Sequence, residues 1–302
     1  MAAIVLNWNS ASETVKCVEA VERSTHPLLK IVIVDNGSSD DSARVLSLQF
    51  GDRYPVLQTG DNLGYAAGNH VGVDWALAQG ADLIWILNPD CIVRTDTLSA
   101  LLAAVGRHGT RAIFCPLLLC LNNPEVVYYA GGELRLETGI PKGRAGLRIA
   151  DHPDILVEHL TDVAHGANLL VPTEVVETFG FMSDAFFLYT EEADYSLQLA
   201  SQGVPTIFVP SAVALHKGNI REKAPTSREG QIRQYYRVRN QLLFWRRNFA
   251  KVKVREYTRR HVRRELRAYR RQLRAGRLPH RYQVMGLVHG LMGRYGRTYH
   301  MR

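Results

Sequence analysis

Polar side chains follow three short apolar runs near the start of the chain, and their types suit binding of a nucleotide and a metal ion. In chain order they are Asn7 with Asn9, Asp35 with Asn36, and Asn88 with Asp90. Asp35 can accept hydrogen bonds from a base or ribose, although an acidic turn with a helix N-cap alone would explain it. Asp90 can bind Mg²⁺ or Mn²⁺ held mainly by a diphosphate, since Mg²⁺ commonly takes only one or two carboxylates. A strand-ending turn is the alternative for Asp90.

A run of small residues, from Asn62 to Asn69, includes Gly64 and Gly68. Small side chains here would let the backbone and the following helix N-terminus approach a ligand closely. Tight packing of the helix on a sheet explains the same spacing. The run is not a dinucleotide fingerprint, which needs GxGxxG directly after the first strand.

A third group of polar residues lies in the second half of the chain. Glu191, Glu192 and Asp194 place three carboxylates at the start of a predicted helix. Such crowding raises the pKa of at least one carboxyl group and suits a general base, whereas an acidic first turn favoured by the helix dipole is the alternative. His216 ends an apolar segment and can bind a metal or phosphate, or be structural.

The elements that position these residues alternate between strand and helix. We expect strands at Ala2–Leu6, Lys30–Val34, Val56–Gln58 and Leu83–Leu87, and helices at Ser12–Arg23, Asp40–Phe50, Gly68–Ala78 and Thr95–Val105. This order predicts an α/β, Rossmann-like domain with a mostly parallel sheet and helices on both faces. Ligands of such sheets bind beyond the carboxyl ends of the strands, where the polar residues converge.

The rest of the chain is less regular and then becomes helical and basic. We expect strands at Ile113–Leu121, Val126–Ala130, His165–Val171, Thr206–Val209 and Ala212–His216, and helices at Thr173–Phe179 and Glu191–Gln202. A basic helical pattern runs from Ser227 to about Ala275. We therefore divide the chain into a ligand-binding half (1–110), a catalytic half (111–220) and a basic tail (221–302).

Charge is divided unevenly along the chain, whose formal net charge is +8. Residues 221–302 hold 24 Lys/Arg and 4 Asp/Glu (24 − 4 = +20), which leaves 13 − 25 = −12 for residues 1–220. In the tail, Val262, Leu266, Tyr269 and Leu273 form an apolar stripe between arginines. This pattern predicts an interfacial helix on an anionic membrane, and packing of the stripe on the body is the alternative.

Several classes of segment and site are not indicated. The four cysteines have no CxxC spacing, so we expect neither a zinc site nor a redox motif but a reduced setting. We see no signal peptide and no apolar run of about 18 residues that would span a membrane. We therefore expect a cytoplasmic protein, peripheral on the cytoplasmic face of the inner membrane.

The ordered set of these segments resembles the inverting glycosyltransferases of family 2, which have the GT-A fold. The resemblance rests on Asn7-Trp8-Asn9, Asp35-Asn36-Gly37-Ser38, the Asn62–Asn69 run, Asn88-Pro89-Asp90, Gly166-Ala167-Asn168, Glu191-Glu192-Ala193-Asp194 and His216. It covers about residues 1–220. The Asn-Pro-Asp form and the Asn-Leu-Gly-Tyr-Ala run look most like bacterial rhamnosyltransferases and their galactofuranosyltransferase relatives.

The resemblance implies a role for each matching residue. Asp35 would bind uracil or thymine, Asp90 and His216 would hold Mg²⁺ or Mn²⁺, Glu192 would be the general base, and Glu191 and Asp194 would be further acids of the catalytic helix. The donor pocket would also be lined by Asn7, Asn9, Asn36, Asn62, Gly64, Gly68, Asn69 and Asn88. The donor would be a dTDP- or UDP-sugar, such as a rhamnose donor. The acceptor would be a glycan or lipid-linked glycan of the cell envelope.

The chain departs from the family pattern at three positions. Asn88 replaces the first acid of the usual DxD motif, Gln198 stands where an arginine is usual, and Glu192 stands where aspartate is the commoner base. The segment Tyr235–Asn240 also recurs in the family, with no role that we can assign from the sequence.

Three other functions fit parts of the sequence. A sugar nucleotidyltransferase shares the strand-end acids, and an inactive GT-A body would tolerate Asn88 and Gln198. A nucleic-acid-binding protein would use the basic tail. The body lacks the patterns of RRM, KH and zinc-finger domains, so nucleic acid is the less favoured partner.

Overall fold

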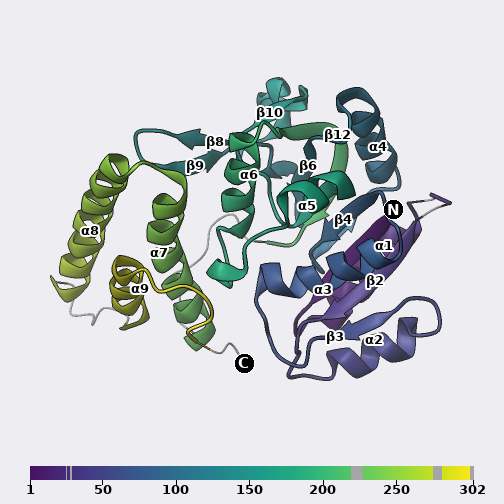
Figure 1. The fold of residues 1–302 in the computed structure, drawn as a ribbon, viewed down its shortest axis with the longest axis horizontal. Helices are drawn as coiled ribbons and strands as arrows, with labels where there is room; N and C mark the ends of the chain where they lie inside the picture. Colours follow the sequence, from purple (N-terminus) through teal and green to yellow (C-terminus); the bar gives the residue numbers. More distant parts are fainter. Residues whose placement is uncertain (25, 28, 219–226, 275–280, 300–302) are drawn as a thin grey trace.

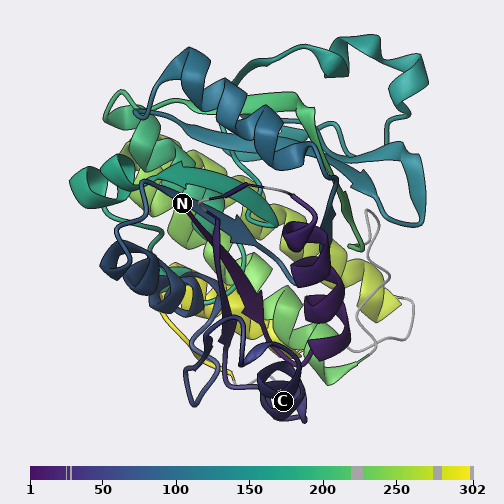
Figure 2. The same ribbon diagram turned by 90° about the vertical axis from the view of Figure 1, so that its right-hand side faces the viewer.

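The computed structural model describes residues 1–302 except 25, 28, 219–226, 275–280 and 300–302. Its centre is a mixed sheet flanked by helices, with three further helices gathered at one side (Figure 1). The same three helices lie behind the N-terminal strands after a turn of 90° (Figure 2). The α/β class predicted from the alternating pattern is confirmed.

The N-terminal half alternates strands and helices as predicted. Its elements are β1 (Ala2–Asn7), α1 (Ala11–Glu22), β2 (Lys30–Asp35), α2 (Ser42–Phe50), β3 (Val56–Gln58), α3 (Tyr65–Ala78) and β4 (Leu83–Leu87). The apolar strands β1 and β2 are buried almost throughout, because a sheet covered on both faces needs continuous apolar runs. α3 begins three residues before the predicted Gly68, directly after Gly64, whose φ is +90°.

The second half adds strands that extend the same sheet, because one of them (Asn168–Pro172) pairs with β4 of the first half. Its elements are β5 (Cys91–Val93), α4 (Thr97–His108), β6 (Ile113–Cys120), β7 (Asn123–Tyr129), β8 (Gly132–Arg135), β9 (Ile140–Gly143), η1 (Ile149–Asp151), η2 (Pro153–Leu156), β10 (His159–Thr161), β11 (Asn168–Pro172), α5 (Thr173–Phe179), η3 (Asp184–Phe186), α6 (Glu191–Ser201) and β12 (Thr206–His216). The two segments predicted at 206–209 and 212–216 form one strand with a register shift between Val209 and Val213.

The sheet is mixed, which corrects the mostly parallel arrangement in one respect. Its order is β10-β12-β6-β11-β4-β1-β2-β3. The strands β4-β1-β2-β3 are parallel, as is the pair β6–β12. However, β11 is antiparallel to both β4 and β6, and the pairs β10–β12, β5–β12 and β6–β7 are antiparallel as well. β11 begins at Asn168, three residues later than predicted, because His165 starts a turn in which its carbonyl accepts from the Asn168 N–H.

The described residues of the C-terminal region form three helices, α7 (Arg228–Asn248), α8 (Lys251–Arg274) and α9 (Arg281–Met292). α7 is part of the core of the protein despite its charge. Tyr235, Tyr236, Arg239 and Leu243 on this helix are fully buried. The predicted basic segment is interrupted at Phe249, whose backbone is extended, and α8 begins after it.

Candidate active site

The strand-end polar residues share one edge of the sheet. In the parallel pairs β1–β2 and β1–β4, Asn7 lies opposite Asp35 and Val5 lies opposite Leu87. This register places the segment that leads from Leu87 to Asp90 beside the other two strand ends. The convergence that the sequence predicted is therefore present in the structure.

Asp35 is buried and held in one orientation by its neighbours. The Asn7 amide donates to Asp35 Oδ1 (2.7 Å), and Ser38 donates from its hydroxyl to Oδ1 (2.6 Å) and from its backbone N–H to Oδ2 (3.1 Å). Thr14 donates to Asn7 Oδ1 (2.7 Å), which turns the Asn7 NH₂ group toward Asp35. No sequence signal indicated this role for Thr14, whereas a serine three residues after an aspartate, such as Ser38, is a recognisable turn signal.

Asn36 organises the loop that precedes α3. Its amide donates to the Gly64 carbonyl (3.1 Å) and accepts from the Leu63 N–H (3.1 Å). A Cβ atom at Gly64 would lie 2.4 Å from the Phe187 carbonyl oxygen, and one at Gly68 would lie 2.9 Å from the Asn36 side chain. The two glycines therefore permit close packing of protein segments, and their contact with a ligand stays a prediction.

The remaining predicted pocket asparagines have different surroundings. Asn9 Oδ1 accepts from the Ser39 N–H (2.7 Å), and Asn62 Oδ1 accepts from the Gly64 N–H (2.9 Å). Asn69 is buried and donates to the Tyr65 carbonyl (2.9 Å), while its Oδ1 has no hydrogen-bond partner among the described residues. The Asn88 N–H donates to the Ala167 carbonyl (3.0 Å) and so joins β4 to the loop before β11.

Asp90 and His216 meet because β12 pairs with β5. His216 lies opposite Cys91, and its Nε2 is 3.2 Å from Asp90 Oδ1. The Gly218 N–H donates to His216 Nδ1 (2.9 Å), so Nε2 is the ring nitrogen that faces the carboxylate. Burial raises the pKa of Asp90, but the hydrogen bond and charge of His216 outweigh it, and the net shift is downward.

The Asp90–His216 pair offers part of a metal site. One carboxylate and one imidazole are suitable ligands for Mn²⁺ or Mg²⁺, and buried His216 Nε2 lacks a well-oriented hydrogen-bond partner among the described residues. No group of three or more His, Cys, Asp or Glu side chains in the described part of the chain can hold a metal. These residues therefore fit a cation whose other ligands come from a bound diphosphate.

Two further rings, which the sequence did not indicate as part of a site, lie beside His216. The Tyr128 ring lies 4.4 Å from the His216 ring, and the His165 ring lies 5.8 Å from it. Burial lowers the pKa of His165 to about 3, with a further contribution from His216, so His165 is neutral. Neither residue stands in a recognisable motif, because each reaches the site only through the pairing of distant strands.

Glu192 lies in the first turn of α6. It is half-buried, and burial raises its pKa. Its charge is a main reason, after burial, that the pKa of Tyr65 is well above the ordinary value. The Tyr65 hydroxyl donates to the Gly166 carbonyl (2.5 Å), next to His165. The charge of Glu192 therefore acts on Tyr65, whose hydroxyl binds the residue next to His165, and the His165 ring lies near His216.

Glu191 is buried inside the protein. Neither carboxylate oxygen has a hydrogen bond of good geometry among the described residues. Burial and the charge of Glu192 raise its pKa well above the usual range, although the nearby backbone N–H groups of Glu191 and Tyr189 and the charge of Arg239 act in the opposite direction. Its exclusion from solvent favours a local structural role over direct contact with substrate.

The turn that leads into α6 is strained. Phe187, Tyr189 and Thr190 have φ values of +70°, +68° and +87°, in the left-handed region that residues with side chains rarely adopt. Each such residue costs about 1–3 kcal/mol, and the surrounding structure must compensate. The sequence gives no warning of this turn, because no glycine stands at these positions.

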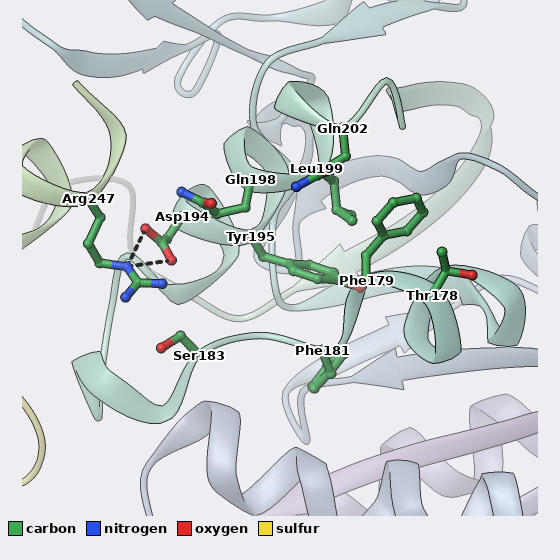
Figure 3. Close-up of a pocket in the computed structure, with 10 residues that line it drawn as sticks. All are labelled: Thr178, Phe179, Phe181, Ser183, Asp194, Tyr195, Gln198, Leu199, Gln202 and Arg247. Carbon is green, nitrogen blue, oxygen red and sulfur yellow. Dashed lines mark hydrogen bonds and ion pairs between the residues drawn. The ribbon is translucent and has the colours of Figure 1, made fainter. Parts of the chain in front are cut away.

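Asp194 points away from Glu192, which is two residues earlier and therefore about 200° round the helix. Its buried carboxylate accepts from Arg247 Nε (3.0 and 3.1 Å) and from the Asn248 amide (2.7 Å). Figure 3 shows this ion pair at the wall of a pocket of about 440 Å³, between α5, α6 and the end of α7. These contacts favour a packing role for Asp194 over a catalytic one.

Arg247 supplies the guanidinium group that the sequence comparison with the family expects at position 198. Gln198 does not contact Asp194 in the described hydrogen bonds but donates to Asn248 Oδ1 (3.0 Å). Because positions four residues apart share a helix face, an arginine at 198 could reach Asp194. Arg247 of α7 thus pairs with Asp194 in place of an arginine at position 198 of α6.

We expect Arg247→Ala to lower the free energy of unfolding by about 1.5–3 kcal/mol, since it removes a hydrogen-bonding cation from a buried carboxylate. Gln198→Arg should restore part of this loss in the double variant and add little in the otherwise native chain. Urea denaturation of the four proteins measures both effects. Equal stability of Arg247→Ala and the double variant would contradict the exchange of partners.

Comparison with known proteins relates the chain to glycosyltransferases. Residues 2–138 match the family model described as Glycosyl transferase family 2. The chain is 21% identical to the low-salt glycan biosynthesis hexosyltransferase Agl10 of Haloferax volcanii over 252 residues, which cover 80% of this chain and 74% of the relative. It is 24% identical to the galactofuranosyltransferase GlfT1 of Mycobacterium tuberculosis over 217 residues, 71% of this chain and 69% of the relative.

The fold is shared with solved transferases at low sequence identity. The structure of GalNAc-T7 with UDP, GalNAc and Mn²⁺ has a TM-score of 0.62 and 15% identity. The similarity covers 81% of this chain and 47% of that one, so this chain matches about half of that protein. The fold is therefore of the GT-A type.

Proposed function

We propose a reaction for this chain from the premise that it belongs to glycosyl transferase family 2. The chain transfers a sugar from a nucleotide diphosphate donor to a hydroxyl group of a glycan, with inversion at the anomeric carbon. The observation that supports the proposal is the charge of half-buried Glu192 on Tyr65, whose hydroxyl binds Gly166 beside His165, which in turn lies near His216 of the Asp90–His216 pair. We infer that the base and the leaving-group site lie in one region of the protein.

We assign a different role in the reaction to each group of site residues. Asp35, fixed by Asn7 and Ser38, accepts a hydrogen bond from the base of the nucleotide. Asp90 and His216 hold the divalent cation, which when bound neutralises charge on the diphosphate leaving group. Glu192 takes the proton of the acceptor hydroxyl as its oxygen attacks the anomeric carbon from the face opposite the leaving group.

We also propose a class of donor and of acceptor. We propose a UDP- or dTDP-sugar, with rhamnose or a similar hexose, because of the Asn-Pro-Asp form of the metal motif. A solved relative of the same fold binds UDP with Mn²⁺, and Agl10 is a hexosyltransferase of glycan biosynthesis. A glycan or lipid-linked glycan of the cell envelope is the proposed acceptor.

A panel of nucleotide sugars tests the proposed reaction. UDP-, dTDP- and GDP-sugars are added with and without Mn²⁺, and thermal stabilisation and the released nucleotide are measured. We expect one nucleotide class to stabilise the protein in a Mn²⁺-dependent way and to release nucleoside diphosphate when acceptor is present. Release of pyrophosphate from a nucleoside triphosphate and a sugar phosphate would instead show a nucleotidyltransferase.

The exposed part of α8 supports a proposal of membrane contact. Tyr257 and His261 pack on the body, but beyond them Leu266, Tyr269 and Leu273 are 48%, 39% and 46% exposed. Arginines flank this stripe, and α9 adds further exposed apolar side chains, including Met285 and Val288. No helix among the described residues is long and apolar enough to cross a membrane. We propose that this surface lies on anionic lipid.

We expect Arg267→Gln, Arg270→Gln and Arg274→Gln together to weaken binding to phosphatidylglycerol vesicles roughly 100-fold, since each basic residue contributes about 1 kcal/mol. Vesicle sedimentation at low and high salt measures the effect. A matched control replaces three exposed arginines of the body, Arg23, Arg44 and Arg111, with glutamine. Stronger binding of the native chain to duplex DNA than to vesicles would favour the nucleic-acid alternative.

A further inference from the structure

The segment Tyr235–Asn240 of α7, left without a role by the sequence, contacts the strained turn before α6. The Asn240 amide nitrogen donates to the carbonyls of Phe186 (3.1 Å), Leu188 (2.7 Å) and Tyr189 (2.9 Å). One side chain therefore binds carbonyl groups along most of the turn. Asn240 is itself fully buried, so water does not compete for these bonds.

Arg239 fixes the orientation of the Asn240 amide. Arg239 Nε donates to Asn240 Oδ1 (2.8 Å), and because Oδ1 is occupied in this way, the NH₂ group must face the turn. Arg239 Nη2 donates to the Phe186 carbonyl (2.6 Å) and adds a second tie to the same turn. An asparagine without this neighbour could rotate its amide by half a turn and present an acceptor to the carbonyls.

The placement of Arg239 indicates more than a contribution to stability. The side chain is fully buried beside the rings of Tyr235 and Tyr236, and the charge of buried Glu191 acts on it. Its guanidinium group donates hydrogen bonds to the backbone carbonyls of Phe186 and Gly296. Burial of an arginine is costly, and apolar packing would stabilise a core at least as well. The gain from this arrangement is the specific geometry of the turn.

The turn connects the two sides of the proposed site. Its Phe187 carbonyl accepts from the Tyr65 N–H (2.9 Å), where α3 begins, and α6 begins one residue after Thr190. Tyr65 and Glu192 are therefore held on opposite ends of one strained segment. A change in the turn displaces Glu192 relative to Tyr65 and to the loop that Tyr65 contacts.

We propose that Asn240, oriented by Arg239, is a positioning residue that holds the left-handed turn and thereby aims Glu192 at the acceptor hydroxyl. The proposal rests on the proposed function only for the role of Glu192. The structure of the turn and its dependence on Asn240 can be tested without any assay of activity.

Asn240→Asp and Asn240→Ala are compared with Asn248→Ala. Aspartate keeps the shape of asparagine but cannot donate to the three carbonyls. Asn248 is a matched control on the same helix, since its amide binds a buried group, Asp194, and not the turn. We expect both Asn240 variants to lower kcat about 100-fold, as a misplacement of about 1 Å can do, with the KM for the donor changed less than about twofold. Asn248→Ala should keep a native kcat.

Hydrogen exchange measured by mass spectrometry provides the readout that is independent of activity. Amides of residues 187–192 should exchange faster in the Asn240 variants than in the native chain and the Asn248→Ala variant. Native exchange and native kcat in Asn240→Asp would overturn the proposal. Faster exchange in a chain whose native form turns over no nucleotide sugar would leave the turn assignment standing and reject the proposed function instead.

Discussion

Glu192→Gln is expected to lower kcat by about 10²–10⁴-fold, the usual contribution of a general base. Glutamine keeps the size of the side chain and its place at the start of α6 but cannot accept the proton of an acceptor hydroxyl. Binding of the donor should be unchanged, because Asp35 and the Asp90–His216 pair are untouched. Steady-state kinetics of nucleoside diphosphate release and donor titration by thermal shift measure the two effects separately.

The pH profile gives a second signature of the same group. Burial raises the pKa of Glu192, so this carboxyl group becomes protonated as pH falls at a higher pH than an exposed glutamate does. Transfer should therefore fall on the acid side of the profile in the native chain, and this limb should be absent from the residual activity of Glu192→Gln. Glu177→Gln, at an exposed glutamate of α5, is the matched control and should be native. Native kcat in Glu192→Gln would remove this residue from the reaction.

The sequence predicts the strand-end half of the site well because its signals are local. Continuous apolar runs identify β1, β2 and β4, and their parallel register then brings Asn7, Asp35 and Asp90 to one edge. Neither inference needs knowledge of a distant contact. Short strands such as β5 and β10 carry no such signal, and the antiparallel insertion of β11 depends on pairings that no local pattern encodes.

The sequence could not show that residues of the basic region contact the turn before α6 and the buried side chain of Asp194. Its net charge of +20 pointed to a partner outside the protein, yet Arg239 is fully buried and Arg247 pairs with buried Asp194. Composition counts charges without saying which of them face solvent. The exposed stripe of α8 agrees with the amphipathic pattern. In contrast, α7 packs against α6 and the turn that precedes it.

Removal of the Asp90 carboxylate is expected to slow transfer about as much as Glu192→Gln does, but through loss of a metal ligand. Asp90→Asn keeps the shape of the side chain and its proximity to His216 but loses the negative charge, and Asn88 offers no second carboxylate in the motif. With so few charged ligands from the protein, the loss of one should lower kcat/KM about 10²–10³-fold, the range seen when one electrostatic contact to a developing charge is removed.

The Mn²⁺ dependence separates a metal ligand from a residue that only shapes the site. In the native chain a chelator should abolish transfer and weaken donor binding, and added Mn²⁺ should restore both. In Asp90→Asn, donor affinity should be low and respond weakly to Mn²⁺, whereas Asp74→Asn, at an exposed aspartate of α3, should respond as the native chain does. If Asp90→Asn binds donor with native affinity and the native response to Mn²⁺, the cation is held elsewhere. The pairing of β5 with β12 would then position His216 for another purpose.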